Sequence, residues 1–154
     1  MMGVDFFLHA GLLAPLYDWD SPFLLRPDEA FVRIPIGYLG FLILAIGLAW
    51  LLTRLDVKRG RDGALIGAAL GAVAWGSFVL GLWSISTASP ALLGGWWVGQ
   101  TVELAVGGYV IGSAHDGVRL RTVALRVGLV LAVAVVSAVA LQAIGYATAP
   151  VISH

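Results

Sequence analysis

Four stretches of apolar residues, each long enough to cross a lipid bilayer, constrain this chain more than any other feature of its sequence. Crossing about 30 Å of hydrocarbon takes about 20 mostly apolar residues in an α-helix. The four stretches are residues 34–53, 64–83, 93–114 and 123–146. Backbone polar groups find no water inside lipid, so such stretches are expected to be helices. The sequence therefore predicts an all-α integral membrane protein with four transmembrane helices in a compact bundle.

Composition agrees with this class. Of the 154 residues, 60% are hydrophobic and only 12% are charged, whereas a soluble domain is about 45–50% apolar and about 25% charged. The formal net charge is zero, which gives no reason to expect nucleic-acid binding. Four short spans leave no length for a second domain. We therefore expect residues 1–154 to form one transmembrane domain in contact with membrane lipids.

Missing residue types exclude several chemistries. The chain has no cysteine, which removes disulfides, thiolate nucleophiles and cysteine-ligated clusters. Its one lysine, Lys58, lies in a hydrophilic loop, so no Schiff-base lysine sits inside a span. None of His9, His115 and His154 falls in mid-span, so a pair of histidines for a buried haem is missing. We expect no cofactor and no metal centre, and a non-enzymatic role is favoured over an enzymatic one.

An apolar segment at residues 4–17 precedes the first span. It is only 14 residues long, and it contains Asp5, His9 and the helix-breaking Pro15. Stretches of that length are more often interfacial or re-entrant than spanning. After it, Pro27 and two following acidic residues are typical of a helix start, so the first long helix is expected to begin near Pro27.

The distribution of lysine and arginine predicts the orientation. Seven of the nine basic residues fall in two loops, residues 54–62 and 115–126. Loops rich in these residues face the cytoplasm. We therefore expect both loops inside, with loop 84–92 and the C-terminus outside, in what is expected to be a bacterial cytoplasmic membrane. Trp19, Trp83, Trp96 and Trp97 fall at the predicted outer boundary, where such rings are enriched.

Glycines recur four residues apart in two spans, which places them on one helix face. Small residues on a face let helix backbones approach closely in lipid. This pattern predicts either packing within one chain or a homo-oligomer contact. Packing within the chain is favoured for the second span, and the two alternatives are held equal for the third. The glycines are Gly63, Gly67, Gly71, Gly95, Gly99, Gly108 and Gly112.

Glu103 is the strongest functional candidate, because it lies near the middle of the third span. A carboxylate at that depth costs a few kcal/mol or more, so it must face the bundle interior, be protonated or be paired. Trp96, Gln100 and Glu103 share one helical face and form a polar stripe. The stripe predicts either a proton-coupling or ligand-binding site or a hydrogen-bonded seam between helices. Trp97 and Gln142 are further candidates, the latter as a partner for Glu103.

Asp5 and His9, four residues apart, share a helical face in the N-terminal segment. With Glu103 they could form a metal or proton site, although two residues at this spacing are weak evidence for a metal. The alternative is a solvated pair at the membrane surface.

Three functions remain open. The first is a non-enzymatic membrane subunit that packs in a homo-oligomer or with other membrane proteins. The second is a proton-coupled small-solute transporter or channel that uses Glu103. The third is a membrane enzyme acting on a lipid or isoprenoid, which ranks last because only one buried acid and no nearby base are visible.

Overall fold

The computed structural model describes residues 2–17, 23–25 and 27–146, and those residues form helices and turns without a strand. The predicted all-α class is therefore confirmed. In chain order the elements are α1 (Met2–Phe7), the π-helix η1 (Leu8–Leu12), the 3-10 helix η2 (Ala14–Leu16), α2 (Pro27–Arg54), α3 (Gly60–Ile85), α4 (Pro90–His115) and α5 (Leu120–Ala143). Trp19 and the C-terminal tail, 147–154, lie outside the described residues.

Three of these helices are long and apolar enough to cross a membrane: Val32–Arg54, Gly60–Ile85 and Arg121–Ala143. Each carries large apolar side chains on its outer surface, such as Val32, Val73 and Val136, which are about 70% exposed or more. Such surfaces are compatible with lipid as the surrounding solvent. α4 is as long as α3, but it is not among these three helices.

Local sequence signals set the helix ends. α2 begins at Pro27, as its acidic start predicts. α4 begins after Ser89, whose Oγ accepts a hydrogen bond of 3.2 Å from the Leu92 backbone N–H. α5 ends at Ala143, so the predicted helical stretch to residue 146 is too long by three residues. Gly145 takes a left-handed conformation there, with a φ of +75°, and turns the chain out of the helix.

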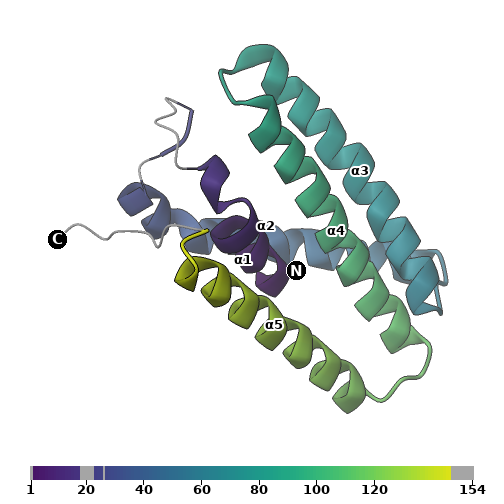
Figure 1. The fold of residues 1–154 in the computed structure, drawn as a ribbon. Helices are drawn as coiled ribbons and strands as arrows, with labels where there is room; N and C mark the ends of the chain where they lie inside the picture. The colour runs from purple at the N-terminus through teal and green to yellow at the C-terminus, as the bar shows by residue number, and fades with distance from the viewer. Residues whose placement is uncertain (1, 18–22, 26, 147–154) are drawn as a thin grey trace.

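α3 and α4 form a tightly packed antiparallel hairpin (Figure 1). A Cβ atom added to Gly63 would lie 2.2 Å from the carbonyl oxygen of Gly108, and one added to Gly67 would lie 2.1 Å from that of Leu104. Gly71 lies similarly close to the Thr101 backbone of α4, and Gly112 lies close to the carbonyl oxygen of Arg59, the residue before α3. The two backbones therefore touch directly, and these glycines pack within the chain.

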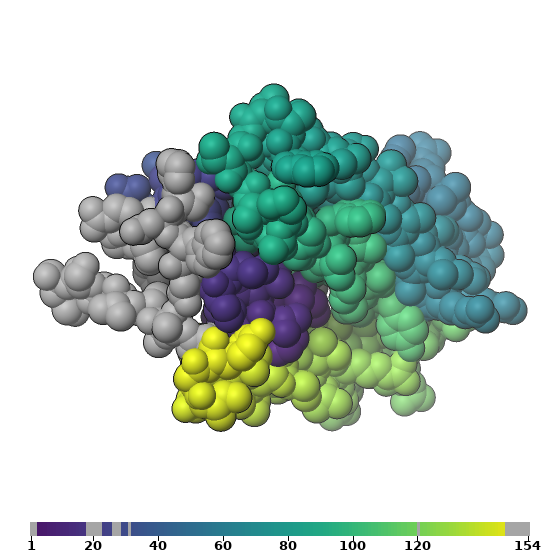
Figure 2. Space-filling view, turned by 45° about the horizontal axis from the view of Figure 1, so that its top comes forward, coloured from purple at the N-terminus to yellow at the C-terminus, as the bar shows by residue number. Residues whose placement is uncertain are grey.

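Residues 2–17, called the N-terminal segment below, lie between α4 and α5. Figure 2 shows the segment seated between those two helices. Glycines again allow the close approach: Gly3 and Gly11 lie against Leu131 and Ala138 of α5. On the other side, the Leu13 side chain lies 3.0 Å from where a Cβ of Gly95 would be.

α2 crosses behind the other long helices (Figure 1). It is anchored near its C-terminal end, where Leu48 and Leu52 form a buried cluster with Val57 and Leu104. Trp75 packs against this cluster, as expected for a tryptophan in mid-span. α4 has contacts with every other long helix and with α1, which makes it the central helix of the fold.

Candidate functional site

Glu103 lies on the central helix and its side chain is completely buried, at 0% exposure. Neither carboxyl oxygen has a hydrogen-bond partner within the part of the chain that the structure describes. The Oε1 atom of Gln100, one turn away, is likewise buried without a partner. Buried polar atoms are nearly always hydrogen-bonded in native proteins, so each exception needs an explanation. A cluster of three such oxygens marks this part of α4 as a candidate site.

The N-terminal segment covers the same face of α4 and runs antiparallel to it. Leu13 packs on Gly95 and Leu8 packs on Gly99, where its side chain lies 3.1 Å from a Cβ position. Continuing in that register, Asp5 precedes Leu8 by about one turn and Glu103 follows Gly99 by about one turn. The carboxyl groups of Asp5 and Glu103 are consequently near enough to interact electrostatically.

A chain of polar contacts connects Asp5 to the start of α4. The Trp96 indole N–H donates a hydrogen bond of 2.6 Å to the Tyr17 hydroxyl. The same hydroxyl is hydrogen-bonded to His9 Nδ1. His9 Nε2 lies 3.4 Å from Asp5 Oδ1, within ion-pair distance. The order is therefore Trp96, Tyr17, His9 and Asp5, with Glu103 beyond the last member.

Hydrogen-bonding capacity fixes the direction of this chain. An indole N–H can only donate, so the Tyr17 oxygen accepts from Trp96 and its own O–H is free to donate to His9 Nδ1. A neutral imidazole that accepts at Nδ1 carries its proton on Nε2. That N–H then points toward the Asp5 carboxylate, as the 3.4 Å separation allows.

Burial tunes the three groups of the N-terminal segment. It raises the pKa of the Asp5 carboxyl to about 6 and lowers the pKa of the His9 imidazole below its ordinary value. It also raises the pKa of the Tyr17 hydroxyl to about 12. Burial thus favours the phenol form of Tyr17 and the neutral form of His9, which matches the direction of the hydrogen bonds.

A metal centre is not formed by these residues. Among the described side chains, no group of three or more histidine, aspartate or glutamate residues has the arrangement of a metal site. The possible metal set of Asp5, His9 and Glu103 therefore gains no support, and their contacts are those of a hydrogen-bonded polar cluster instead.

The two remaining candidates have other partners. Trp97 faces α3, where its indole N–H donates a hydrogen bond of 2.9 Å to the Ala72 carbonyl. Adjacent residues on a helix point about 100° apart, so Trp97 leaves the face that Trp96 shares with Glu103. Gln142 donates a hydrogen bond of 3.1 Å to the Ala10 carbonyl, and so joins α5 to the N-terminal segment.

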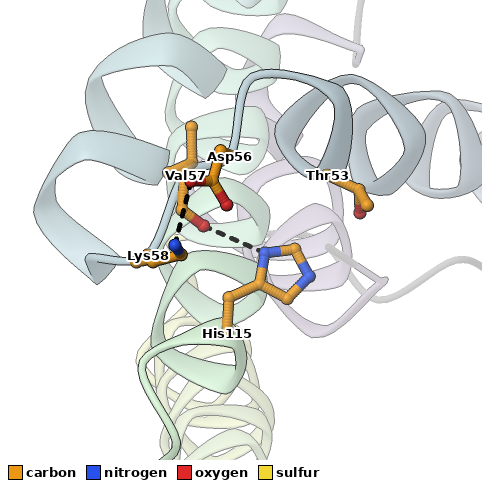
Figure 3. A pocket seen from close by; sticks show the side chains of 5 residues that line it. All are labelled: Thr53, Asp56, Val57, Lys58 and His115. Atoms are coloured by element: carbon orange, nitrogen blue, oxygen red, sulfur yellow. Dashed lines mark hydrogen bonds and ion pairs between the residues drawn. The ribbon is translucent and has the colours of Figure 1, made fainter.

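A pocket with a volume of about 260 Å³ lies at the C-terminal end of α4 (Figure 3). It is lined by Thr53, Asp56, Val57, Lys58 and His115. Lys58 forms an ion pair of 2.9 Å with Asp56, and both side chains are largely exposed to solvent. His115 Nδ1 lies 3.0 Å from the Val57 carbonyl oxygen and connects the α2–α3 loop to the end of α4. We interpret this contact as structural, because it holds the α2–α3 loop against the end of α4.

Sequence reasoning missed two members of the polar cluster. Tyr17 joins His9 to Trp96, and Tyr38 of α2 lies within electrostatic reach of Asp5. Tyr17 follows His9 by eight residues, but Pro15 lies between them and interrupts a regular helix, and Tyr38 belongs to a different helix from Asp5. Periodicity therefore identifies neither residue. The sequence shows only that Tyr17 ends a short apolar segment, which does not indicate a partner for its hydroxyl group.

Comparison with known proteins gives no relative. No protein-family model, no curated protein and no solved structure matches this chain.

Proposed function

We propose that the protein is a small proton-coupled membrane transporter or channel in which Glu103 binds and releases the proton. In this proposal α2, α3, α4 and α5 all cross the bilayer and the N-terminal segment is re-entrant from the outer side. The basic loops 54–62 and 115–126 face the cytoplasm, in accordance with the positive-inside rule.

The location of α4 supports its assignment as a spanning helix, in addition to α2, α3 and α5. The helix has the length to cross, and its neighbours on several sides shield it from lipid. Polar residues in a membrane almost always face the interior of the bundle. Two buried polar residues on α4, Gln100 and Glu103, are thus what a central transmembrane helix with a functional stripe would have.

The single observation that carries the proposal is the complete burial of Glu103 without a hydrogen-bond partner among the described residues. An unsatisfied buried polar group costs about 1–3 kcal/mol, and a charged one costs more. A purely structural glutamate would be expected to donate its proton to a neighbouring carbonyl. A carboxyl group that is buried, unpaired and close to a second acid fits a site that takes up and releases a proton.

The experiment is proton influx into liposomes under an imposed membrane potential, followed with a trapped pH-sensitive dye. The unmodified protein is expected to conduct above protein-free liposomes, and Glu103→Gln is expected to fall to that background. Glu103→Asp keeps an acid and should retain part of the flux. Equal flux in the unmodified protein, Glu103→Gln and Glu103→Ala would remove Glu103 from the mechanism.

A membrane subunit is the second candidate, because one observation favours it. The outer face of α2 exposes a row of large apolar residues, while its contacts with the rest of the chain are few. Such a face could pack against a second copy or another membrane protein. Sizing of the purified protein in native lipid discs tests this candidate, and a strictly monomeric particle without a partner would remove it.

A further inference from the structure

We propose that the N-terminal segment is the proton path to Glu103 from the outer side of the membrane, with Tyr17, His9 and Asp5 as successive carriers. This inference rests on the proposed function of Glu103. It adds the route by which the proton arrives, and it assigns a role to three residues outside the long helices.

The placement of the segment gives the path its two ends. Tyr17 lies beside Trp96, two turns into α4 from its predicted outer end at Pro90. Asp5 lies about two turns deeper, at the level of Glu103, because Leu8 packs on Gly99 between them. Residues 5–17 therefore extend from the predicted outer boundary to the level of the buried carboxyl group.

Each carrier can both accept and release a proton, which a relay requires. The Tyr17 O–H passes its proton to His9 Nδ1 and is reprotonated from the outer aqueous side. The resulting imidazolium releases its Nε2 proton to Asp5. No hydrogen bond joins the carboxyl groups of Asp5 and Glu103 within the described residues, so the Asp5 side chain must rotate toward Glu103 to pass the proton on. One proton enters, one proton reaches Glu103, and each carrier returns to its starting charge. His9 is left with its proton on Nδ1, and a flip of the imidazole ring restores the arrangement that accepts the next proton. Trp96 cannot relay, because its N–H only donates, so its role is to position Tyr17.

The backbone around His9 also sets this segment apart. Residues Leu8–Leu12 form a π-helix, closed by a hydrogen bond of 2.7 Å from the Leu13 N–H to the Leu8 carbonyl. Single π-helical turns are rare and are frequent at functional sites. Gln142 of α5 bonds to the Ala10 carbonyl inside this turn and holds it in place.

The surroundings leave few competing proton acceptors. The titratable groups that interact with Asp5 are His9 and Tyr17 of the same segment, the N-terminal amine, Tyr38 of α2 and Glu103 of α4. α5 meets the segment with Leu131, Ala138, Leu141 and Gln142, none of which titrates. Within the described residues, the sequence of acceptors from Tyr17 inward is thus His9, Asp5 and Glu103.

The test follows Glu103 protonation directly by time-resolved infrared spectroscopy after a pH jump, with the full-length protein in lipid nanodiscs. The Glu103 signal is the carboxyl band that Glu103→Gln removes. Tyr17→Phe, His9→Gln and Asp5→Asn are each expected to slow its response by about tenfold or more, since positioned acid–base groups contribute about 10²–10⁴-fold to proton transfer. Tyr146→Phe and His115→Gln are matched controls, and both are expected to respond at the unmodified rate. Tyr146 also touches the segment, through a 3.4 Å hydrogen bond to the Leu12 carbonyl, but lies outside the path.

The outcomes separate this inference from the function on which it rests. If Glu103 titrates and the three relay variants respond as fast as the unmodified protein, the path is wrong while the role of Glu103 stands. Equal slowing in the control variants would also overturn the path, because it would show a general loosening of the segment. If no band differs between the unmodified protein and Glu103→Gln at any pH, the proposed function itself fails.

Discussion

Replacing Gly67 with alanine is expected to destabilise the α3–α4 hairpin by about 3 kcal/mol, the upper part of the range for overpacking a well-packed core. The added Cβ would lie 2.1 Å from the Leu104 carbonyl oxygen and 2.8 Å from its carbonyl carbon. The optimal separation of non-bonded heavy atoms is about 3.5 Å, so the new Cβ and this oxygen must move apart by about 1.4 Å. The neighbour is backbone, which cannot rotate away as a side chain would. The separation would therefore be felt along the whole glycine-lined contact.

Gly81 supplies the matched control in the same helix, because nothing lies within 4 Å of a Cβ added there. Alanine is favoured over glycine in a helix by roughly 1 kcal/mol, so Gly81→Ala should be neutral or slightly stabilising. The assay is thermal unfolding of the purified protein in mild detergent, read as loss of the monodisperse peak in gel filtration. If Gly67→Ala and Gly81→Ala have the same melting temperature, the two backbones do not touch as described and the reasoning is refuted.

Three further predictions concern other parts of the chain. Glu103→Met should have a melting temperature equal to or above that of the unmodified protein. Leaving a buried polar group without a hydrogen bond costs about 1–3 kcal/mol, and the substitution removes two oxygens that have no described partner. A clear drop in melting temperature would reveal a partner and count against the site. His115→Ala should speed tryptic cleavage at Lys58 and Arg59, since it removes the contact to the Val57 carbonyl; unchanged cleavage would show that the loop is held elsewhere. Lys58→Cys introduces the chain's single cysteine, and an impermeant thiol reagent should label it only after cells are opened; labelling in intact cells would reverse the proposed orientation.

Apolar length and helix-end chemistry accounted for most of the fold. The four predicted stretches fall within α2, α3, α4 and α5 apart from the last three residues of the fourth, where Gly145 ends the helix. Glu103 was identifiable because a charge at that depth in an apolar helix is costly whatever its surroundings. The glycine spacing likewise located the faces on which helices meet, although it could not say which face meets which.

The polar cluster itself was beyond prediction from sequence. It depends on the N-terminal segment lying between α4 and α5, which brings Tyr17 against Trp96, 79 residues away in the chain. No periodicity encodes such a contact, and the π-helical turn that carries His9 has no recognised sequence signal. The spacing of four residues identified Asp5 and His9 as a pair, but it could not show that they face α4.

The measurement that tests the central claim most directly is an equilibrium infrared titration of the unmodified protein and Glu103→Gln in lipid nanodiscs. The proposed role predicts one carboxyl band that gains and loses its proton between acid and alkaline pH and that is absent from Glu103→Gln. Identical spectra for the two proteins across that range would show that Glu103 does not exchange a proton, and would contradict the proposed function.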